Sequence, residues 1–370
     1  MTKDDSRTRS SEHLFRCRGC GAQFAFDPAS GTLTCPFCAQ QQVIDSPDGA
    51  NIEELDFEDF LSKEETQETV EAQTIQCRAC GASSTHDPKL TSLSCPFCGT
   101  HIVEEGKTQK LIQPRSLLPF KVTRDQAVKS FRTWLRGLWF APSRLKRDVH
   151  YPQALQGLYT PFWTYDADTT SLYKGQRGDD YWENESYSTT EGGRTVHKTR
   201  RVRKTRWSSV SGTVRKAFND TLVPASRSLP ERLAWKLTTW NLNQLVPFSP
   251  DYLSGFKAET YTVTLSEGFD QAREVMDGAI REAIRNDIGG DHQRIQDVKT
   301  RYDDVTFKHI LLPIWISSYK FGEKVYRFLV NGQTAEIRAE RPWSWVKIAG
   351  AVLFVIAVIL LIFAVTGAFK

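Results

Sequence analysis

The sequence lacks the motifs that mark the common nucleotide-binding and hydrolytic sites. Its only Gly-Lys-Thr triplet begins at Gly106, and His101 occupies the place of the first glycine of a phosphate-binding loop. No acidic magnesium box accompanies that triplet. Neither a Gly-x-Ser-x-Gly turn nor a His-Glu-x-x-His helix occurs. We therefore expect a protein that is not an enzyme, and helicase or ATPase activity in particular has no support.

The first residues also lack an apolar stretch of the kind that directs secretion. Residues 1–9 are polar or charged apart from Met1. Without a secretory signal, we expect the cysteines to lie in the reducing cytosol, where disulfides are rare.

All eight cysteines fall into one pattern that is used twice. A Cys-x2-Cys pair, fourteen residues and a second Cys-x2-Cys pair recur sixty residues later, and 12 of the 22 aligned positions of 17–38 and 77–98 are identical. The pattern comprises Cys17, Cys20, Cys35, Cys38, Cys77, Cys80, Cys95 and Cys98. Zinc binds four thiolates in a tetrahedron, and each Cys-x2-Cys turn delivers two of them. The sequence thus predicts two zinc ribbons, with one closed structural ion in each.

Other interpretations of the cysteines are weaker. Disulfides would need an oxidising compartment, and a thioredoxin-like pair would need a βαβ context that the flanking residues do not provide. Iron in a rubredoxin-like site would suit the same four sulfurs.

Composition divides the chain into segments. Ribbons at 1–44 and 73–106 flank an acidic linker at 45–72, in which Asp45 to Glu71 include eleven acids and one base. We interpret this linker as a solvated segment with a transient helix, although its apolar spacing would also suit a docking peptide. Residues 1–106 carry a formal charge of −10, and the remainder carries +14. An acidic ribbon pair favours protein partners over phosphate backbones.

The C-terminal segment, 343–370, sets the predicted location. Residues 348–369 carry no charge and would span about 33 Å as a helix, enough for the hydrocarbon core. Trp343, Trp345 and Lys347 lie where the membrane interface would be. We expect a single-pass tail anchor in the cytoplasmic (inner) membrane, with the bulk of the chain in the cytoplasm and membrane lipid as a partner.

Residues 107–342 predict an α+β domain, either one unit or two related halves at about 107–250 and 251–342. Stretches 123–140 and 266–288 have the apolar spacing of amphipathic helices, and a Pro-x-Trp strand follows each at 161–163 and 313–315. This indicates a second, weaker duplication. Asn331-Gly332 predicts a hairpin with a type I′ turn. The fold class is therefore α+β, with two small ribbons, a duplicated helix/β-strand domain and one transmembrane helix.

The densest basic patch follows a Gly/Ser/Thr/Glu-rich stretch that predicts an exposed hairpin. It comprises Lys198, Arg200, Arg201, Arg203, Lys204, Arg206 and the aromatic Trp207. Such a patch could be a solvated hairpin, could contact lipid or an acidic partner, or could bind single-stranded nucleic acid.

Several segments together resemble a bacterial family. They are the paired ribbons, the segments 158–165, 252–256, 309–315 and 326–332, and the hydrophobic tail. The chain resembles membrane-anchored proteins with transcription-factor-IIB-type zinc ribbons, often labelled primosomal protein N′ (replication factor Y) or superfamily II helicase-like. The resemblance implies zinc at the eight cysteines and a membrane role beside flotillin-like scaffold proteins in envelope stress. Ala39 and Ala335 depart from the family's pattern, where glycines are expected.

These observations predict a non-enzymatic, membrane-anchored adaptor whose ribbons recruit cytoplasmic or membrane-scaffold proteins. The alternative is a membrane-tethered nucleic-acid-binding protein, associated with replication, that uses the patch at 198–207.

Overall fold

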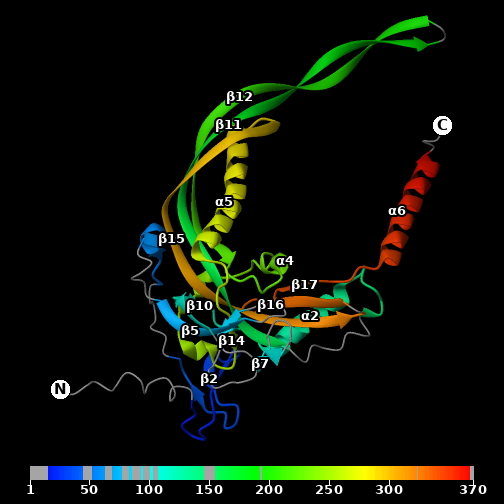
Figure 1. Ribbon diagram of the computed structural model, residues 1–370. Coiled ribbons are helices and arrows are strands. Elements are labelled where there is room, and N and C mark those ends of the chain that lie inside the picture. The colour runs from blue at the N-terminus through cyan, green and yellow to red at the C-terminus, as the bar shows by residue number, and fades with distance from the viewer. Residues whose placement is uncertain are drawn as a thin grey trace.

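The computed structural model describes residues 16–44, 52–62, 69–76, 83–85, 93–94, 101–102, 107–145, 155–191, 194–322 and 324–366. The fold is mixed and mostly sheet, and its main sheet has nine strands among these residues. Three long antiparallel strands form the spine of this sheet (Figure 1): β11 (Gln156–Glu191), β12 (Arg194–Pro224) and β15 (His292–Phe321). Shorter strands complete it: β4 (Leu55–Asp56), β10 (Ser116–Leu117), β13 (Val246–Pro247), β14 (Lys257–Ala258), β16 (Lys324–Asn331) and β17 (Ile337–Ala339).

The remaining elements are short, apart from three helices. Small sheets contain β1 (Ala25–Asp27), β2 (Thr32–Thr34), β3 (Gln41–Gln42), β5 (Thr69–Gln76), β6 (Ser83–Thr85), β7 (Leu93–Ser94), β8 (His101–Ile102) and β9 (Lys107–Ile112). The helices are α1 (Phe57–Ser62), α2 (Arg124–Gly137), α4 (Glu231–Ala234), η1 (Leu242–Gln244), η2 (Pro250–Leu253), α5 (Leu265–Ile288) and α6 (Trp345–Thr366).

The long strands continue beyond the body of the molecule as a two-stranded arm. β15 pairs with β11 only as far as Gly178, opposite His292, and from Asp179 to Glu191 β11 pairs with β12 alone. We call residues 179–191 and 194–206 the distal hairpin, and Figure 1 shows it arching away from the sheet. The predicted exposed hairpin is confirmed.

The two predicted amphipathic helices are α2 and α5. Each begins after a threonine whose hydroxyl accepts from the backbone N–H three residues on, in a reciprocal capping box at Thr123 and Thr264. On α5, Ala272, Met276 and Ile280 recur every four residues and are buried. This face packs on the concave side of the long strands (Figure 1).

The two Pro-x-Trp strands are hydrogen-bonded to the residues that precede α5 and α2. The indole N–H of Trp163 donates to the carbonyl oxygen of Val263 at 3.0 Å, and that of Trp315 donates to Val122 at 2.8 Å. Val263 directly precedes the N-cap of α5, and Val122 directly precedes the N-cap of α2. Buried indole N–H groups need such partners, so the backbone before each helix satisfies a tryptophan that lies far from it in the sequence.

The connection after β16 differs from the predicted type I′ turn. That turn requires positive φ at both central residues, and neither Asn331 nor Gly332 has one. Instead the side-chain oxygen of Asn331 accepts from the backbone N–H groups of Gln333 and Thr334, and Ala335 takes the left-handed conformation with φ of 62°. Gly332 is needed for space, because a Cβ there would lie 2.7 Å from the ring of Phe120.

Part of the acidic linker is packed against the sheet, which corrects the prediction of a solvated segment for residues 52–62. β4 pairs with β15, and the ring of Phe57 lies against Tyr165 and Phe307. Glu54 forms an ion pair at 2.7 Å with the buried ammonium of Lys308. The end of the predicted linker, residues 69–72, is also ordered, because it belongs to β5 and pairs with β9. Residues 45–51 and 63–68 lie outside the described residues.

Candidate metal centre and surrounding surfaces

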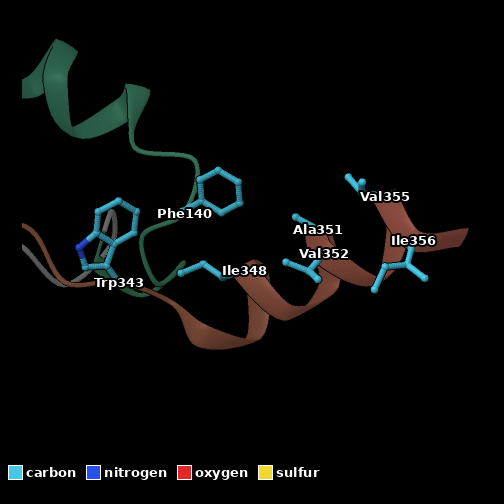
Figure 2. Close-up of a pocket in the computed structure, with 7 residues that line it drawn as sticks. All are labelled: Phe140, Trp343, Ile348, Ala351, Val352, Val355 and Ile356. Atoms are coloured by element: carbon cyan, nitrogen blue, oxygen red, sulfur yellow. The ribbon is translucent and has the colours of Figure 1, made fainter. Parts of the chain in front are cut away.

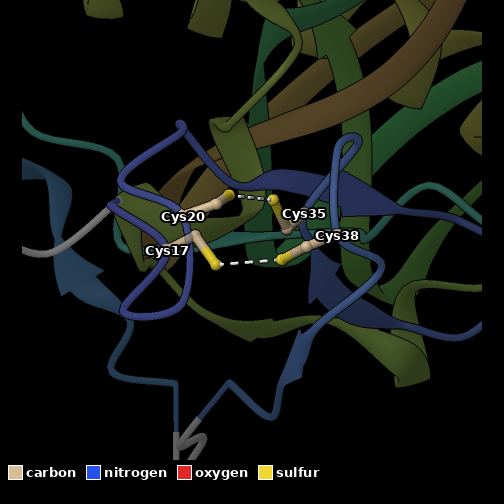
Figure 3. Close-up of side chains that lie close together, drawn as sticks. All are labelled: Cys17, Cys20, Cys35 and Cys38. Carbon is tan, nitrogen blue, oxygen red and sulfur yellow. Dashed lines mark hydrogen bonds between the residues drawn. The ribbon is translucent and has the colours of Figure 1, made fainter.

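The segment predicted to be the first zinc ribbon brings four sulfurs together, and we keep the name first ribbon for residues 16–44. The Sγ atoms of Cys17, Cys20, Cys35 and Cys38 all lie within 4.8 Å of one another. Figure 3 shows them as two close pairs, Cys17 with Cys38 at 3.4 Å and Cys20 with Cys35 at 3.5 Å. Sulfurs bound tetrahedrally at about 2.3 Å from zinc lie about 3.8 Å apart. All four cysteines are free thiols, so the cluster fits a four-thiolate metal site.

Each Cys-x2-Cys turn closes through the same backbone pattern. The N–H of Gly21 donates to the carbonyl oxygen of Cys17, and the N–H of Ala39 donates to that of Cys35. Both donors are left-handed, with φ of 74° at Gly21 and 60° at Ala39. The departure at Ala39 therefore keeps the turn geometry and adds local backbone strain, because a side chain disfavours this region.

The second turn also prepares a thiolate. Backbone N–H groups of Cys38 and then Phe37 lower the pKa of Cys35 to about 6, although its burial acts in the opposite direction. Amide donors to sulfur stabilise the charged form, which is the form that binds metal. These residues can hold a divalent ion without further ligands, and such an ion would bind the turns together and leave no position open for a substrate.

The ribbon is anchored to the body of the molecule on one side. Phe24 and Phe26 are buried, and the ring of Phe26 meets Tyr252 edge-on at 5.3 Å. The backbone N–H of Phe26 donates to the carbonyl oxygen of Ser254 at 2.9 Å. Cys17 and Cys35 belong to the same hydrophobic cluster as these phenylalanines, so metal binding would also stabilise the packing of the first ribbon against the sheet domain.

The predicted second ribbon is described only in part. Cys77, Cys80, Cys95 and Cys98 lie outside the described residues. The register of its last two strands nevertheless repeats that of the first ribbon. β2 and β3 pair Leu33 with Gln42, and β7 and β8 pair Leu93 with Ile102, sixty residues on. The second metal site remains a prediction from sequence.

The basic patch lies on β12 of the distal hairpin, where acidic residues of β11 face it. Arg200 pairs with Glu185 at 2.9 Å, Lys204 pairs with Glu183 at 2.7 Å, and Arg203 pairs with Asp180. Three of the six cations of the predicted patch are therefore paired with carboxylates of the same hairpin.

Aromatic side chains also contact cations of the patch, through cation–π interactions. Arg201 lies over the ring of Trp182 at 4.9 Å, and Arg206 lies over Tyr181 at 5.2 Å. One face of Trp207 is covered by the guanidinium of Arg294 at 3.8 Å. These contacts stiffen a two-stranded arm that is otherwise marginal in water, and they occupy groups that base stacking would need.

The C-terminal residues form a helix suited to crossing a membrane. Within the described residues, one helix is long and apolar enough to do so, Trp345–Phe363, and none of it is buried. Trp343 and Trp345 stand at its start, and Arg341 lies 4.0 Å from the ring of Trp343. Lys347 is drawn back toward the body, where its ammonium donates to two backbone carbonyls of the segment after α2.

Two buried titratable groups line a cavity of about 210 Å³ beside β14 and β15. His309 Nδ1 donates to the carbonyl oxygen of Ile112 at 2.9 Å, and Glu259 accepts a hydrogen bond from the Ser226 hydroxyl. Burial lowers the pKa of His309 to about 4 and raises that of Glu259 to about 8. Both groups are thus held neutral in an apolar site.

Sequence reasoning missed two exposed aromatic features. Phe37 stands at the tip of the second Cys-x2-Cys turn and is 83% exposed, and Trp139, just after α2, is 80% exposed. The signal for Phe37 was available, since the Cys-Pro-Phe-Cys turn leaves its side chain outside the metal cluster. Nothing in the local sequence placed Trp139 beside a helix that begins more than 200 residues later.

Comparison with known proteins gives one full-length similarity and no assigned role. The chain is 26% identical over 351 residues to the uncharacterized protein YdjG of Bacillus subtilis (strain 168), covering 90% of this chain and 92% of that protein. No family model matches the chain, and no solved structure matches it. The chain is thus similar to an uncharacterized bacterial protein along nearly the whole of both sequences.

Proposed function

We propose that the protein is a non-enzymatic, membrane-anchored adaptor that binds a partner protein through its zinc ribbons. The single observation that carries this proposal is the exposure of Phe37 on a turn of the four-cysteine cluster, which a bound metal would hold rigid. A large apolar side chain in water is unfavourable, and aromatic residues are enriched at protein interfaces. Cys95 to Cys98 repeat the same Cys-Pro-Phe-Cys turn with Phe97, so both ribbons would offer the same contact.

The remaining features are consistent with that role. The first ribbon has one face packed on the core and the Phe37 tip directed away from it, as a binding module fixed on a scaffold requires. α6 would hold the scaffold at the cytoplasmic membrane, with zinc as the structural ion in each ribbon. The family resemblance suggests membrane-scaffold proteins of the flotillin type as the partner class, with a role in envelope stress.

The proposal is tested with full-length protein extracted from membranes in mild detergent. The variants are Phe37→Ser, the double variant with Phe97→Ser, and Leu172→Ser as a control at an exposed apolar position on β11. We expect the double variant to keep its zinc, measured by elemental analysis, and to lose proteins that the wild type and the control both recover. Recovery of an unchanged set by the zinc-loaded double variant would contradict the proposal.

The alternative, a membrane-tethered nucleic-acid-binding protein, receives less support. Its basic patch is paired with carboxylates and aromatic rings in the distal hairpin. Binding to phosphate backbones would require those ion pairs to open, and it would fall steeply with salt. A mobility shift with single-stranded DNA at low salt, lost in Arg201→Ala, would favour this alternative.

A further inference from the structure

An apolar groove lies where α6 leaves the sheet domain. It has a volume of about 450 Å³, and Figure 2 shows the seven side chains that line it: Phe140, Trp343, Ile348, Ala351, Val352, Val355 and Ile356. All seven are apolar. Phe140 comes from the segment after α2, so one wall is built by a part of the chain far from the predicted span.

Hydrogen bonds fix that segment to the first turn of α6. The backbone N–H of Ser344 donates to the carbonyl oxygen of Phe140 at 2.8 Å. The ammonium of Lys347 donates to the carbonyl oxygens of Ala141, at 2.8 Å, and Trp139, at 3.3 Å. The segment 138–141 and the start of α6 therefore form one unit, and wherever α6 begins, this segment lies beside it.

The surface of this unit is unusually apolar for one facing water. Trp139 and Trp345 are 80% and 79% exposed, and Val346, Trp343 and Phe140 are also exposed. Contiguous apolar surface of this kind marks an interaction site. The patch runs without a break into the lipid-facing sides of α6, so a membrane that receives α6 would cover it as well.

The chemistry at the edge of the patch also fits a lipid headgroup region. Tryptophan is enriched at that depth because its ring is apolar and its N–H can bond to water or headgroups. Arg341, stacked on Trp343, and Lys347 place cations at the same level, where phosphates lie. No charged side chain lines the groove itself, which suits an acyl chain.

We propose that the segment after α2 is a second membrane contact, in which Trp139 and Phe140 enter the headgroup region beside α6 and the groove holds a lipid acyl chain. This rests on the proposed membrane anchoring by α6. The consequence is orientation, because two contacts far apart in sequence restrict how the sheet domain can rotate about the span. A single helix followed by a flexible connection would leave that rotation free.

The test uses full-length protein in phosphatidylcholine vesicles containing phosphatidylglycerol, with or without lipids brominated near the top of the acyl chain. Bromine quenches the emission of tryptophans at that depth, and the chain has ten tryptophans. The variants are Trp139→Phe, Trp345→Phe and, as a control, Trp182→Phe, which alters an exposed tryptophan of the distal hairpin.

If three interface tryptophans are quenched, Trp139→Phe should remove about one third of the quenchable emission, as should Trp345→Phe, whereas Trp182→Phe should change none of it. An unchanged quenchable emission in Trp139→Phe, with a loss in Trp345→Phe, would overturn the second contact and leave the anchor intact. Extraction of the whole protein from the vesicles by alkaline carbonate would instead contradict the proposal that α6 anchors the protein in the membrane. Protection of Trp139 that increases with the protein-to-lipid ratio would assign the patch to a second copy of the chain, and would likewise overturn the proposal.

Discussion

Replacing Glu259 with glutamine should stabilise the protein above neutral pH and change little at pH 5. Glu259 is buried between β14 and the end of β12, and burial raises its pKa to about 8, even though the hydroxyls of Ser226 and Ser228 act to lower it. Glutamine has nearly the same shape and keeps an oxygen that can accept from Ser226. It removes only the ability to ionise.

The direction in which stability changes with pH follows from how many protons the folded and unfolded chains bind. Unfolded glutamate has a pKa of about 4.3, so above that pH the unfolded chain loses a proton that the folded chain keeps up to a pKa of about 8. The contribution of neutral Glu259 to the free energy of unfolding is fully present below the unfolded pKa. Between that pKa and the folded pKa it falls by about 1.4 kcal/mol for each pH unit. By pH 8 the loss amounts to about 4–5 kcal/mol, as an order of magnitude.

His309 makes the free energy of unfolding change with pH in the opposite direction, and it does so at acid pH. Burial lowers its pKa to about 4, so the folded chain resists a proton that the unfolded chain takes up below about pH 6.5. Between roughly pH 4.5 and 6.5 the two slopes cancel, and above pH 6.5 only the slope from Glu259 remains, so stability should fall from there to about pH 8.

The assay is thermal unfolding of the full chain in detergent micelles from pH 5 to pH 9. For a domain of this size, about 4–5 kcal/mol corresponds to a shift of roughly 10 °C in Tm at pH 8. Glu274→Gln, at an exposed carboxylate of α5, is the control and should follow the wild type throughout. Parallel profiles for Glu259→Gln and the wild type would refute the reasoning.

Other substitutions test the metal site and the sheet packing. Ala39→Gly should stabilise the first ribbon by about 1 kcal/mol by removing a side chain from the left-handed region, seen as slower metal loss to a chelator; faster loss would contradict it. Cys17→Ser should lower the zinc content by one ion per chain, and full retention would exclude a four-thiolate site there. Gly268→Ala should destabilise by about 1–3 kcal/mol, because its Cβ would lie 2.7 Å from Trp163, whereas Gly278→Ala on the same helix meets nothing within 4 Å and should stabilise by up to about 1 kcal/mol.

The helices of the sheet domain could be predicted because two local signals agree. On α2 and α5 an apolar residue recurs every three to four positions, and a threonine with a polar partner three residues on marks the start. Both signals act within one or two turns, so no knowledge of distant residues is needed. The hydrogen bond from the indole N–H of Trp163 to the carbonyl oxygen of Val263 cannot be predicted from such local signals, since it joins residues 100 positions apart.

The length of the central strands could not be predicted for a related reason. In the distal part of β11, polar and charged residues occupy both faces, and the alternation that identifies a strand is absent. Pairing with β12 is what makes it a strand, and register then places Glu185 opposite Arg200. Read alone, the basic run predicts a binding patch, but the pairing of half of its cations with carboxylates depends on the register of β11 against β12.

In the acidic linker, composition led to a wrong prediction. Eleven acids in a short segment predict solvation, yet residues 52–62 also contain the apolar side chains that dock on the sheet. Glu54 provides a charge that the buried ammonium of Lys308 requires. One ion pair and a few apolar contacts are enough to hold the segment against the sheet despite its high average charge. Composition alone cannot identify which carboxylate forms the ion pair.

One hydrophobic cluster joins the first ribbon to the segment beside α6. It includes Phe24 and Phe26 of the ribbon, Phe131 of α2, and Ala141 and Leu145 after α2. Close-packed interiors hold their parts in fixed positions, so the ribbon is oriented relative to the start of α6 by side-chain packing, without an intervening flexible connection. A flexible tether would raise the concentration of a bound partner near the membrane but leave its orientation free. The packed cluster would fix both, and this is the physical reason that an adaptor of this kind would build its metal site into the core of a large sheet domain.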